Sequence, residues 1–271
     1  MNNIMSVFSY SFMVNAFICG SLICICAALL GVILVLKRYA MIGDGLSHVG
    51  FGALSLASVA NLSPLYVAIP VVVICALILM RMSNNSKIKG DAAIGLLSTG
   101  ALTFGIMIVS AAGVNTDLNS YLFGSILALD KTDLILCILT CTLIALMFIL
   151  RYKQIFSVTF DENFAKATGI RTGLYNSLIA ILSAITVVLG MRMMGTLLIS
   201  AIIIFPALTS MRVFRSFKNV CIFSVIIAVV CFVAGMTVSF LLSTPAGATV
   251  VTINILMFLV FWIASIILKR S

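Results

Sequence analysis

Charged side chains are scarce in this chain of 271 residues, in which Asp, Glu, Lys and Arg together account for 8% and only seven residues are acidic. A soluble domain carries about 25% charged residues, and about half of its residues are apolar. Hydrophobic residues here make up 63%, and the mean hydropathy is +1.31. This composition excludes a soluble enzyme, a disordered chain and a small disulfide scaffold. It predicts an all-α polytopic membrane protein that lies in a lipid bilayer. No nucleic-acid partner is expected, because the basic residues form no patch on a polar domain.

Long polar segments are also absent. The longest is 151–173, which is too short for a separate domain, so we expect residues 1–271 to form a single transmembrane domain. There is no Walker-type Gly-Lys-Ser/Thr loop, and the chain therefore has no ATP site of its own.

The eight cysteines all lie inside apolar runs and are interpreted as small buried hydrophobes. No basic residue precedes Lys37, so the first run lacks the start of a signal peptide and is expected to be a retained helix.

Long apolar runs dominate the chain, and spanning the hydrocarbon core takes about 20 such residues. Nine runs are candidates, of which the second is the least hydrophobic and the richest in glycine. They are 12–36, 45–61, 64–82, 91–113, 133–150, 174–191, 195–211, 219–243 and 247–268. Only Met191 to Met194 separate the sixth run from the seventh, so one of the two could re-enter without crossing. The sequence therefore predicts eight or nine transmembrane helices.

The basic residues set the expected orientation, because cytoplasmic loops are enriched in Lys and Arg. With the N-terminus outside, fourteen of the sixteen basic residues lie inside, and only Lys131 and Arg192 fall outside. The opposite orientation inverts this ratio. We therefore expect an outside N-terminus, a cytoplasmic C-terminus and a cytoplasmic segment 151–173.

The only histidine, His48, follows Asp44 by four residues in the second apolar run. Residues i and i+4 share one face of a helix, so the carboxylate and the imidazole point the same way. On a helix, His48 would lie about 15 Å past Arg38, near the bilayer midplane. An ionisable pair at that depth is costly and marks a functional site; the alternative is a hydrogen bond that only ties two helices together.

Carboxylate and imidazole are a ligand set for a divalent transition metal, although zinc typically takes four ligands. A two-fold dimer through this helix would supply the pair twice. Gly43, Gly45, Gly50 and Gly52 would let another backbone approach closely. Ordinary packing of small residues explains these glycines equally well.

Residues 161–170 are predicted to form a short helix, with acidic residues at its start, Lys166 near its end and Gly169 as its stop. Further on, Pro206 interrupts a transmembrane helix, where nearby hydroxyl side chains, Ser200 among them, could satisfy the freed carbonyls. Pro245 and Gly247 predict a turn or helix start at the outer surface.

Three ordered motifs carry a resemblance. The first is Gly43–His48, after the basic end of the first helix, and the second is Asp161–Ile170. The third runs from Gly195 to Pro206 and is followed by the Pro-x-Gly of Pro245 and Gly247. In order and spacing, over nearly the whole chain, they resemble the membrane permease subunit of bacterial ABC importers for zinc, manganese or iron(II).

The resemblance implies a homodimer of permease chains in the bacterial plasma membrane. A cytoplasmic ABC ATPase dimer would dock onto segment 151–173, and an extracytoplasmic metal-binding lipoprotein would deliver the ion. Asp44 and His48 would be the ligands of the transported metal, which would be a transient ligand, and no tightly bound cofactor is expected. The expected coupling residues are Asp161, Glu162, Phe164, Ala165 and Gly169. The expected helix-packing or gating residues are Gly43, Gly45, Gly52, Gly195, Pro206, Pro245 and Gly247.

The sequence leaves the metal open. Many manganese-type members carry Pro-Gly after the histidine, where this chain has Phe51-Gly52, and some zinc permeases are rich in histidine. An ion-coupled secondary transporter that uses Asp44 and His48 as a relay is the alternative. An intramembrane aspartyl protease would need two aspartates at depth, and a serine protease would need a Gly-x-Ser-x-Gly elbow, which is absent. Permeases for haem or siderophore chelates are generally longer.

Overall fold

The computed structural model describes residues 11–85, 90–113, 124 and 131–269, and within these residues it contains helices and no strands. The prediction of an all-α fold is confirmed. In chain order the helices are α2 (Ser11–Leu36), α3 (Ile42–Val59), α4 (Pro64–Asn85), α5 (Gly90–Ala111), α7 (Lys131–Leu150), α8 (Tyr152–Phe160), α9 (Glu162–Ala167), α10 (Thr172–Met194), α11 (Thr196–Val213), α12 (Phe217–Leu242) and α13 (Ala246–Lys269).

Every predicted apolar run corresponds to one of these helices. Eight helices in the described part of the chain are long and apolar enough to cross a membrane, and α10 and α11 are both among them. Only Gly195 separates these two helices, and each is long enough on its own to be a full span. The question of eight or nine crossings depends instead on α3, which is less apolar than the eight.

The low hydropathy of α3 follows from its surroundings. It packs against α4, α5, α10 and α11, and twelve of its eighteen residues are buried. A transmembrane helix that is screened from lipid by other helices does not need an apolar surface all round. Two polar residues of α3, Ser47 and Ser55, are accordingly buried among protein side chains.

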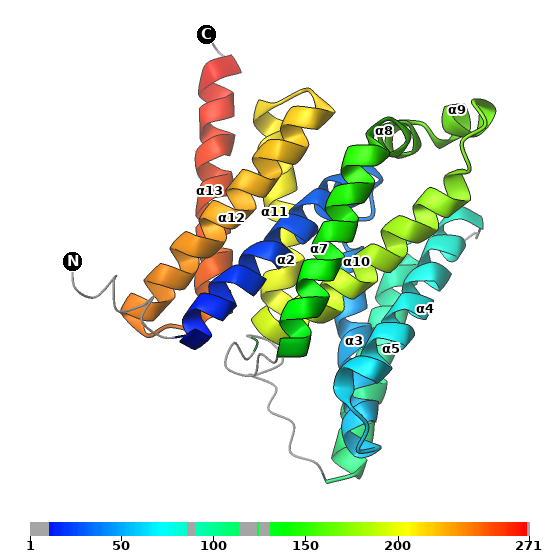
Figure 1. Cartoon of the computed structure of the whole chain (residues 1–271), viewed down its shortest axis with the longest axis vertical. Coiled ribbons are helices and arrows are strands. Elements are labelled where there is room, and N and C mark those ends of the chain that lie inside the picture. Colours follow the sequence, from blue (N-terminus) through cyan, green and yellow to red (C-terminus); the bar gives the residue numbers. More distant parts are fainter. Residues whose placement is uncertain (1–10, 86–89, 114–123, 125–130, 270–271) are drawn as a thin grey trace.

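The helices form two outer groups with a central one between them (Figure 1). α3, α4 and α5 lie on one side, α11, α12 and α13 on the other, and α2, α7 and α10 lie between them. Burial agrees with this order, because 67% of the apolar window of α2 and 72% of that of α10 are buried, against 11% for α13. α2 and α10 are thus the core around which the outer helices pack.

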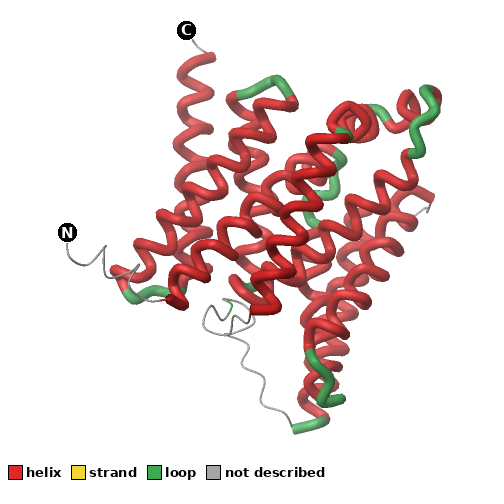
Figure 2. Tube along the Cα trace, viewed as in Figure 1, coloured by secondary structure: helices red, strands yellow, loops and turns green. Residues whose placement is uncertain are grey.

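The connections lie mainly at the two ends of the bundle (Figure 2). The C-terminal end of α13, the α11–α12 connection, α8 and α9 lie at one end, and the start of α2 and the α12–α13 turn lie at the other (Figure 1). The segments that the basic residues predict to be cytoplasmic therefore share one end. We call this the basic end; its assignment to the cytoplasm stays a prediction.

Candidate functional site

Asp44 and His48 lie in the first two turns of α3, on the same face of the helix. His48 Nε2 is 3.6 Å from Asp44 Oδ2. The side chains are partly exposed, at 42% for Asp44 and 27% for His48, although most of α3 is buried. The i, i+4 spacing thus gives the geometry that the sequence predicted, with both side chains partly exposed.

A third polar group joins this pair from α11. Ser200 Oγ lies 3.3 Å from Asp44 Oδ1 and 3.0 Å from the carbonyl oxygen of Thr196, so its one proton is shared between two acceptors. Sequence reasoning had assigned Ser200 to carbonyls freed by Pro206, and that assignment is wrong. A lone serine one turn after Gly195, in an otherwise apolar run, was the available signal.

The other hydroxyl groups near Pro206 do not reach a freed carbonyl either. Thr209 Oγ1 donates to the carbonyl oxygen of Phe205, and Ser210 Oγ donates to that of Pro206 itself. A proline removes the hydrogen bond to the carbonyl four residues before it, which here belongs to Ile202. These hydroxyl groups therefore donate to the carbonyl four residues before them, and not to the carbonyl that Pro206 leaves without a donor.

The glycines of α3 make room for neighbouring helices of the same chain. A Cβ added at Gly43 would lie 2.7 Å from Ile203 Cδ1 of α11, and one at Gly45 would lie 2.6 Å from Ile94 Cγ2 of α5. A Cβ at Gly52 would lie 2.7 Å from the carbonyl oxygen of Ala101. Packing of small residues within the chain, one of the two explanations that the sequence allowed, is present at these glycines; close approach of a second chain stays a prediction.

Asp44, His48 and Ser200 together offer carboxylate oxygen, imidazole nitrogen and hydroxyl oxygen. This donor set suits a divalent transition metal, because imidazole binds zinc, iron and their neighbours and carboxylate suits manganese as well. Within the described residues, no group of three or more His, Cys, Asp and Glu side chains is placed to hold a metal. The described part of the chain thus offers two strong ligands and an auxiliary hydroxyl at this site.

The cysteines lie outside this site. Six of the eight are buried and the other two are half-buried, as free thiols within the helix bundle. The Cys137 thiol donates a weak hydrogen bond of 3.8 Å to Met193 Sδ within the core. Their interpretation as buried hydrophobes is confirmed.

The short helix predicted at residues 161–170 is present as α9 at the basic end. The Asp161 carboxylate caps it by accepting a hydrogen bond of 2.9 Å from the backbone N–H of Phe164. Gly169, at φ +82°, ends the segment. Ala165 is fully buried against the body of the protein, whereas Phe164 is 61% exposed. The segment thus presents an aromatic side chain outward while one small residue anchors it.

Glu162, the first residue of α9, lies at the centre of a polar network that sequence reasoning missed. It accepts from Lys166 Nζ at 3.0 Å and from Asn176 Nδ2 at 3.1 Å, and Lys37 Nζ lies 3.9 Å away. Lys37 also donates to Asn176 Oδ1. Lys37 and Asn176 are 139 residues apart in sequence, so no local pattern could have paired them.

Burial and charge act in opposite directions on this network. Burial would raise the pKa of Glu162, but hydrogen bonds from Lys166 and Asn176 and the charge of Lys37 outweigh it and hold that pKa below its usual value. Burial lowers the pKa of Lys37, and the neighbouring Glu162 carboxylate opposes that shift. Each charge, on Glu162 and on Lys37, thus stabilises the other against the desolvation cost of burial.

The remaining predicted residues lie at the ends of α10, α11 and α13 or inside them. Gly195, at φ +86°, forms the tight turn between α10 and α11 and sets the position of Ser200 one turn later. Pro206 is buried inside α11. Pro245 lies in the turn before α13, and Gly247 is buried in the first turn of that helix. None of the three later residues contributes a donor to the Asp44 and His48 pair.

The profile of the ABC 3 transport family matches residues 9–265 of this chain. The chain is 30% identical to "Manganese import system permease protein ScaB" of Streptococcus gordonii over 262 residues, 96% of this chain and 94% of that protein. It is 27% identical to "High-affinity zinc uptake system membrane protein ZnuB" of Haemophilus influenzae over 244 residues, 90% of this chain and 94% of that protein.

The fold is likewise similar to that of a solved structure, "PsaBC from Streptococcus pneumoniae in complex with Fab". The TM-score is 0.84 at 29% sequence identity, and the match covers 96% of this chain and 95% of that one. Similarity of both sequence and fold thus extends over the whole bundle, including α3 and α9.

Proposed function

The chain belongs to the ABC 3 transport family and is the membrane permease subunit of a metal-ion ABC transporter, and from this premise we propose that it imports a divalent transition metal ion. Zinc, manganese and iron(II) are the candidate substrates, because a carboxylate and an imidazole suit all three. The chain is a transport subunit and not an enzyme, and ATP hydrolysis belongs to a separate subunit.

The observation that carries this proposal is the position of Asp44 and His48 on one face of α3, with Ser200 beside the carboxylate. An ionisable pair within a transmembrane bundle is retained for a function more often than for packing. The pair offers two strong ligands at 3.6 Å from each other, which is close enough for both to bind one ion after small side-chain movements. We assign Asp44 and His48 as the ligands that the ion meets on its path.

A second copy of the chain completes this site in the proposal. Two strong ligands bind an ion weakly, and a transport site must release its ion, but selection of a metal requires a fuller shell. A two-fold dimer with α3 near its axis would bring two carboxylates and two imidazoles together. The partial exposure of both side chains in one chain is consistent with an open side toward such a partner.

Membership of an ABC transporter family supports two further proposed partners, an ATPase dimer and a metal-binding lipoprotein. We propose that α9 is the coupling helix onto which a cytoplasmic ATPase dimer docks, and that Phe164 provides an exposed apolar contact. An extracytoplasmic metal-binding lipoprotein would release the ion at the opposite end of the bundle. Closure of the ATPase subunits would then change which end is open to the Asp44 and His48 pair.

The secondary-transporter alternative is not favoured, because the family transports metals with an ATPase. A simple observation separates the two mechanisms. Uptake by a secondary transporter depends on an ion gradient and needs no second protein, whereas uptake by this permease requires its ATPase.

The test is the cellular content of zinc, manganese and iron under limiting supply, in a host whose other importers for these metals have been removed. Four strains are compared: wild type, a deletion, His48→Ala, and Ser58→Ala. Ser58 serves as the control because it lies at the exposed end of α3, where its hydroxyl donates to the carbonyl oxygen of Leu54 in the same helix. We expect the deletion and His48→Ala to lose the same metal while Ser58→Ala retains it.

Two results would contradict the proposal. Unchanged content of all three metals in the deletion strain would exclude metal import. Normal content in His48→Ala, at wild-type permease abundance, would reduce the pair to a tie between helices.

A further inference from the structure

We propose that Lys37 is the residue through which movement of α9 reaches the metal-binding helix α3. Lys37 lies directly after α2, and the same connection leads into α3, where Asp44 follows seven residues later. Its ammonium group is bound to Glu162 of α9 and to Asn176 of α10. This inference rests on the proposed function, because it needs α9 to be the segment that the ATPase moves.

Lys37 is deeply buried for a charged side chain. Its side chain is only 7% exposed, whereas that of Lys166, the other cation on the same carboxylate, is 59% exposed. A buried charge that loses its partner leaves a large desolvation cost, while a surface pair contributes little. Displacement of Glu162 therefore affects Lys37 far more strongly than it affects Lys166.

The rest of the α8–α9 segment is attached elsewhere. Tyr152, Phe156 and Phe160 of α8 pack on Phe217 at the start of α12, with ring centroids 5.5 to 6.0 Å apart. α9 itself is anchored by Ala165 and by the Glu162 network. α8 also contacts α2, and among the side-chain bonds of the segment described above it is the Glu162 network that includes a residue of the α2–α3 connection, Lys37.

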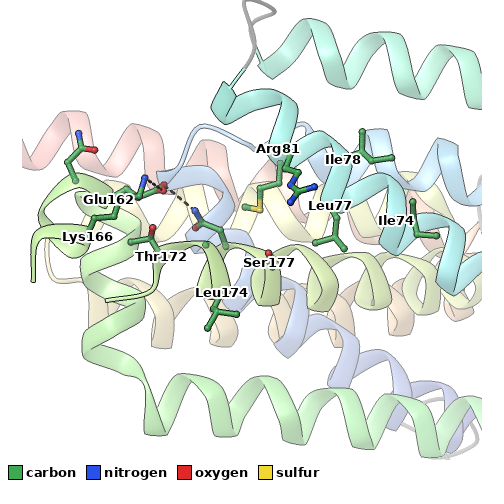
Figure 3. Close-up of a pocket in the computed structure, with 13 residues that line it drawn as sticks. Ile74, Leu77, Ile78, Arg81, Glu162, Lys166, Thr172, Leu174 and Ser177 are labelled. Carbon is green, nitrogen blue, oxygen red and sulfur yellow. Dashed lines mark hydrogen bonds and ion pairs between the residues drawn. The ribbon is translucent and has the colours of Figure 1, made fainter. Parts of the chain in front are cut away.

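An open cavity leaves α9 room to move. It has a volume of about 930 Å³ and lies between the end of α4, α9 and the first turns of α10. Figure 3 shows Arg81 and Ile78 on the wall from α4, with Glu162 and Lys166 on the wall from α9. The Glu162 network lies beside this space and, together with the buried Ala165, holds α9 to the transmembrane body.

The connection from Lys37 to Asp44 is short and hydrogen-bonded at both ends. Arg38 adopts a left-handed conformation with φ +63°, which makes a tight turn after α2. The backbone N–H groups of Lys37, Arg38 and Tyr39 donate back to carbonyl oxygens of α2, over 2.7 to 3.1 Å. The N–H of Ile42 donates to the carbonyl oxygen of Tyr39, and that of Gly45 to Met41, both over 3.0 Å. In the proposal, a shift of Lys37 reaches the first turn of α3 through this turn.

The test compares transport with ATP hydrolysis in the complete complex of permease, ATPase and metal-binding protein in proteoliposomes. Zn²⁺ and Mn²⁺ are supplied in parallel, and the metal taken up per ATP hydrolysed is measured. For Lys37→Met we expect hydrolysis within about twofold of wild type and a roughly tenfold fall in metal per ATP, a size typical of coupling between distant sites. Glu162→Gln, which keeps the shape of the side chain, should show the same loss if Lys37→Met does not assemble.

Lys218→Met is the matched control, since Lys218 is an exposed lysine at the same end and lies outside the network. An unchanged ratio of metal to ATP in Lys37→Met or Glu162→Gln would overturn the inference, and so would an equal loss of hydrolysis and uptake, which indicates a structural role. Absence of ATP-driven uptake in the wild-type complex would instead contradict the proposed function itself.

Discussion

Ser200 of α11 reaches the Asp44 carboxylate of α3 across 156 residues of sequence, with its hydroxyl oxygen 3.3 Å from Oδ1. Gly195, with φ +86°, stands directly before α11, and α11 packs against α3. His48 holds the other carboxylate oxygen, Oδ2. The two oxygens of Asp44 thus contact different helices. The orientation of the carboxylate is therefore set by α3 and α11 together.

Replacing Ser200 with Ala should weaken metal transport without abolishing it. The hydroxyl contributes one long, shared hydrogen bond to Asp44, and such a bond is worth about 1 kcal/mol, which corresponds to roughly a fivefold rise in the metal concentration for half-maximal uptake. Uptake kinetics of Ser200→Ala and of the control Ser58→Ala measure this change. Equal kinetics in the two variants would show that Ser200 does not orient the carboxylate.

Replacing glycine with alanine should have opposite effects on the stability of the permease at two positions, Gly52 and Gly100. A Cβ at Gly52 would lie 2.7 Å from the backbone oxygen of Ala101, whereas a Cβ at Gly100 would have no atom within 4 Å. We expect Gly52→Ala to cost about 1–3 kcal/mol, because α3 and α5 must separate. Gly100→Ala should be neutral or should stabilise by up to about 1 kcal/mol through helix propensity. Thermal unfolding of the purified permease in detergent compares them; a Gly52→Ala variant as stable as Gly100→Ala would contradict this account.

Most of the helices could be predicted from the sequence, because lipid demands long apolar runs whatever their neighbours are. The number of membrane crossings was harder to predict, because α3 is screened by protein and its hydropathy falls below that of the eight candidate spans. The Asp44 and His48 pair could be predicted because both lie on one helix at a spacing of four. Ser200, Lys37 and Asn176 could not be assigned, because their partners belong to other helices and only tertiary packing brings them together.

Removing Arg192 should destabilise the bundle at the end opposite the coupling segment. Arg192 Nη1 of α10 lies 2.7 Å from Asp133 Oδ1 of α7, and the Asp133 side chain is only 2% exposed. Arg192→Met leaves a buried carboxylate without its cation, at a cost of about 3 kcal/mol. The double variant Arg192→Met/Asp133→Leu removes both charges and should recover most of that loss. Unfolding midpoints of the two variants decide the question; a double variant no more stable than the single one would show that the charge was not the cause.

The Glu162 network should make stability depend on pH in a defined direction. Burial alone would raise the pKa of Glu162, but Lys166, Asn176 and Lys37 hold it below the usual value. A carboxylate whose pKa is lower in the folded state stabilises that state above its unfolded pKa, which for a glutamate is about 4.3. This stabilisation is lost as the pH falls through the lower, folded value. The difference in unfolding midpoint between wild type and Glu162→Gln should therefore be constant near neutral pH and shrink toward zero below about pH 4. A difference that persists unchanged into acid would mean that the carboxylate charge does not hold α9 in place, and that hydrogen bonding by the side chain alone does so.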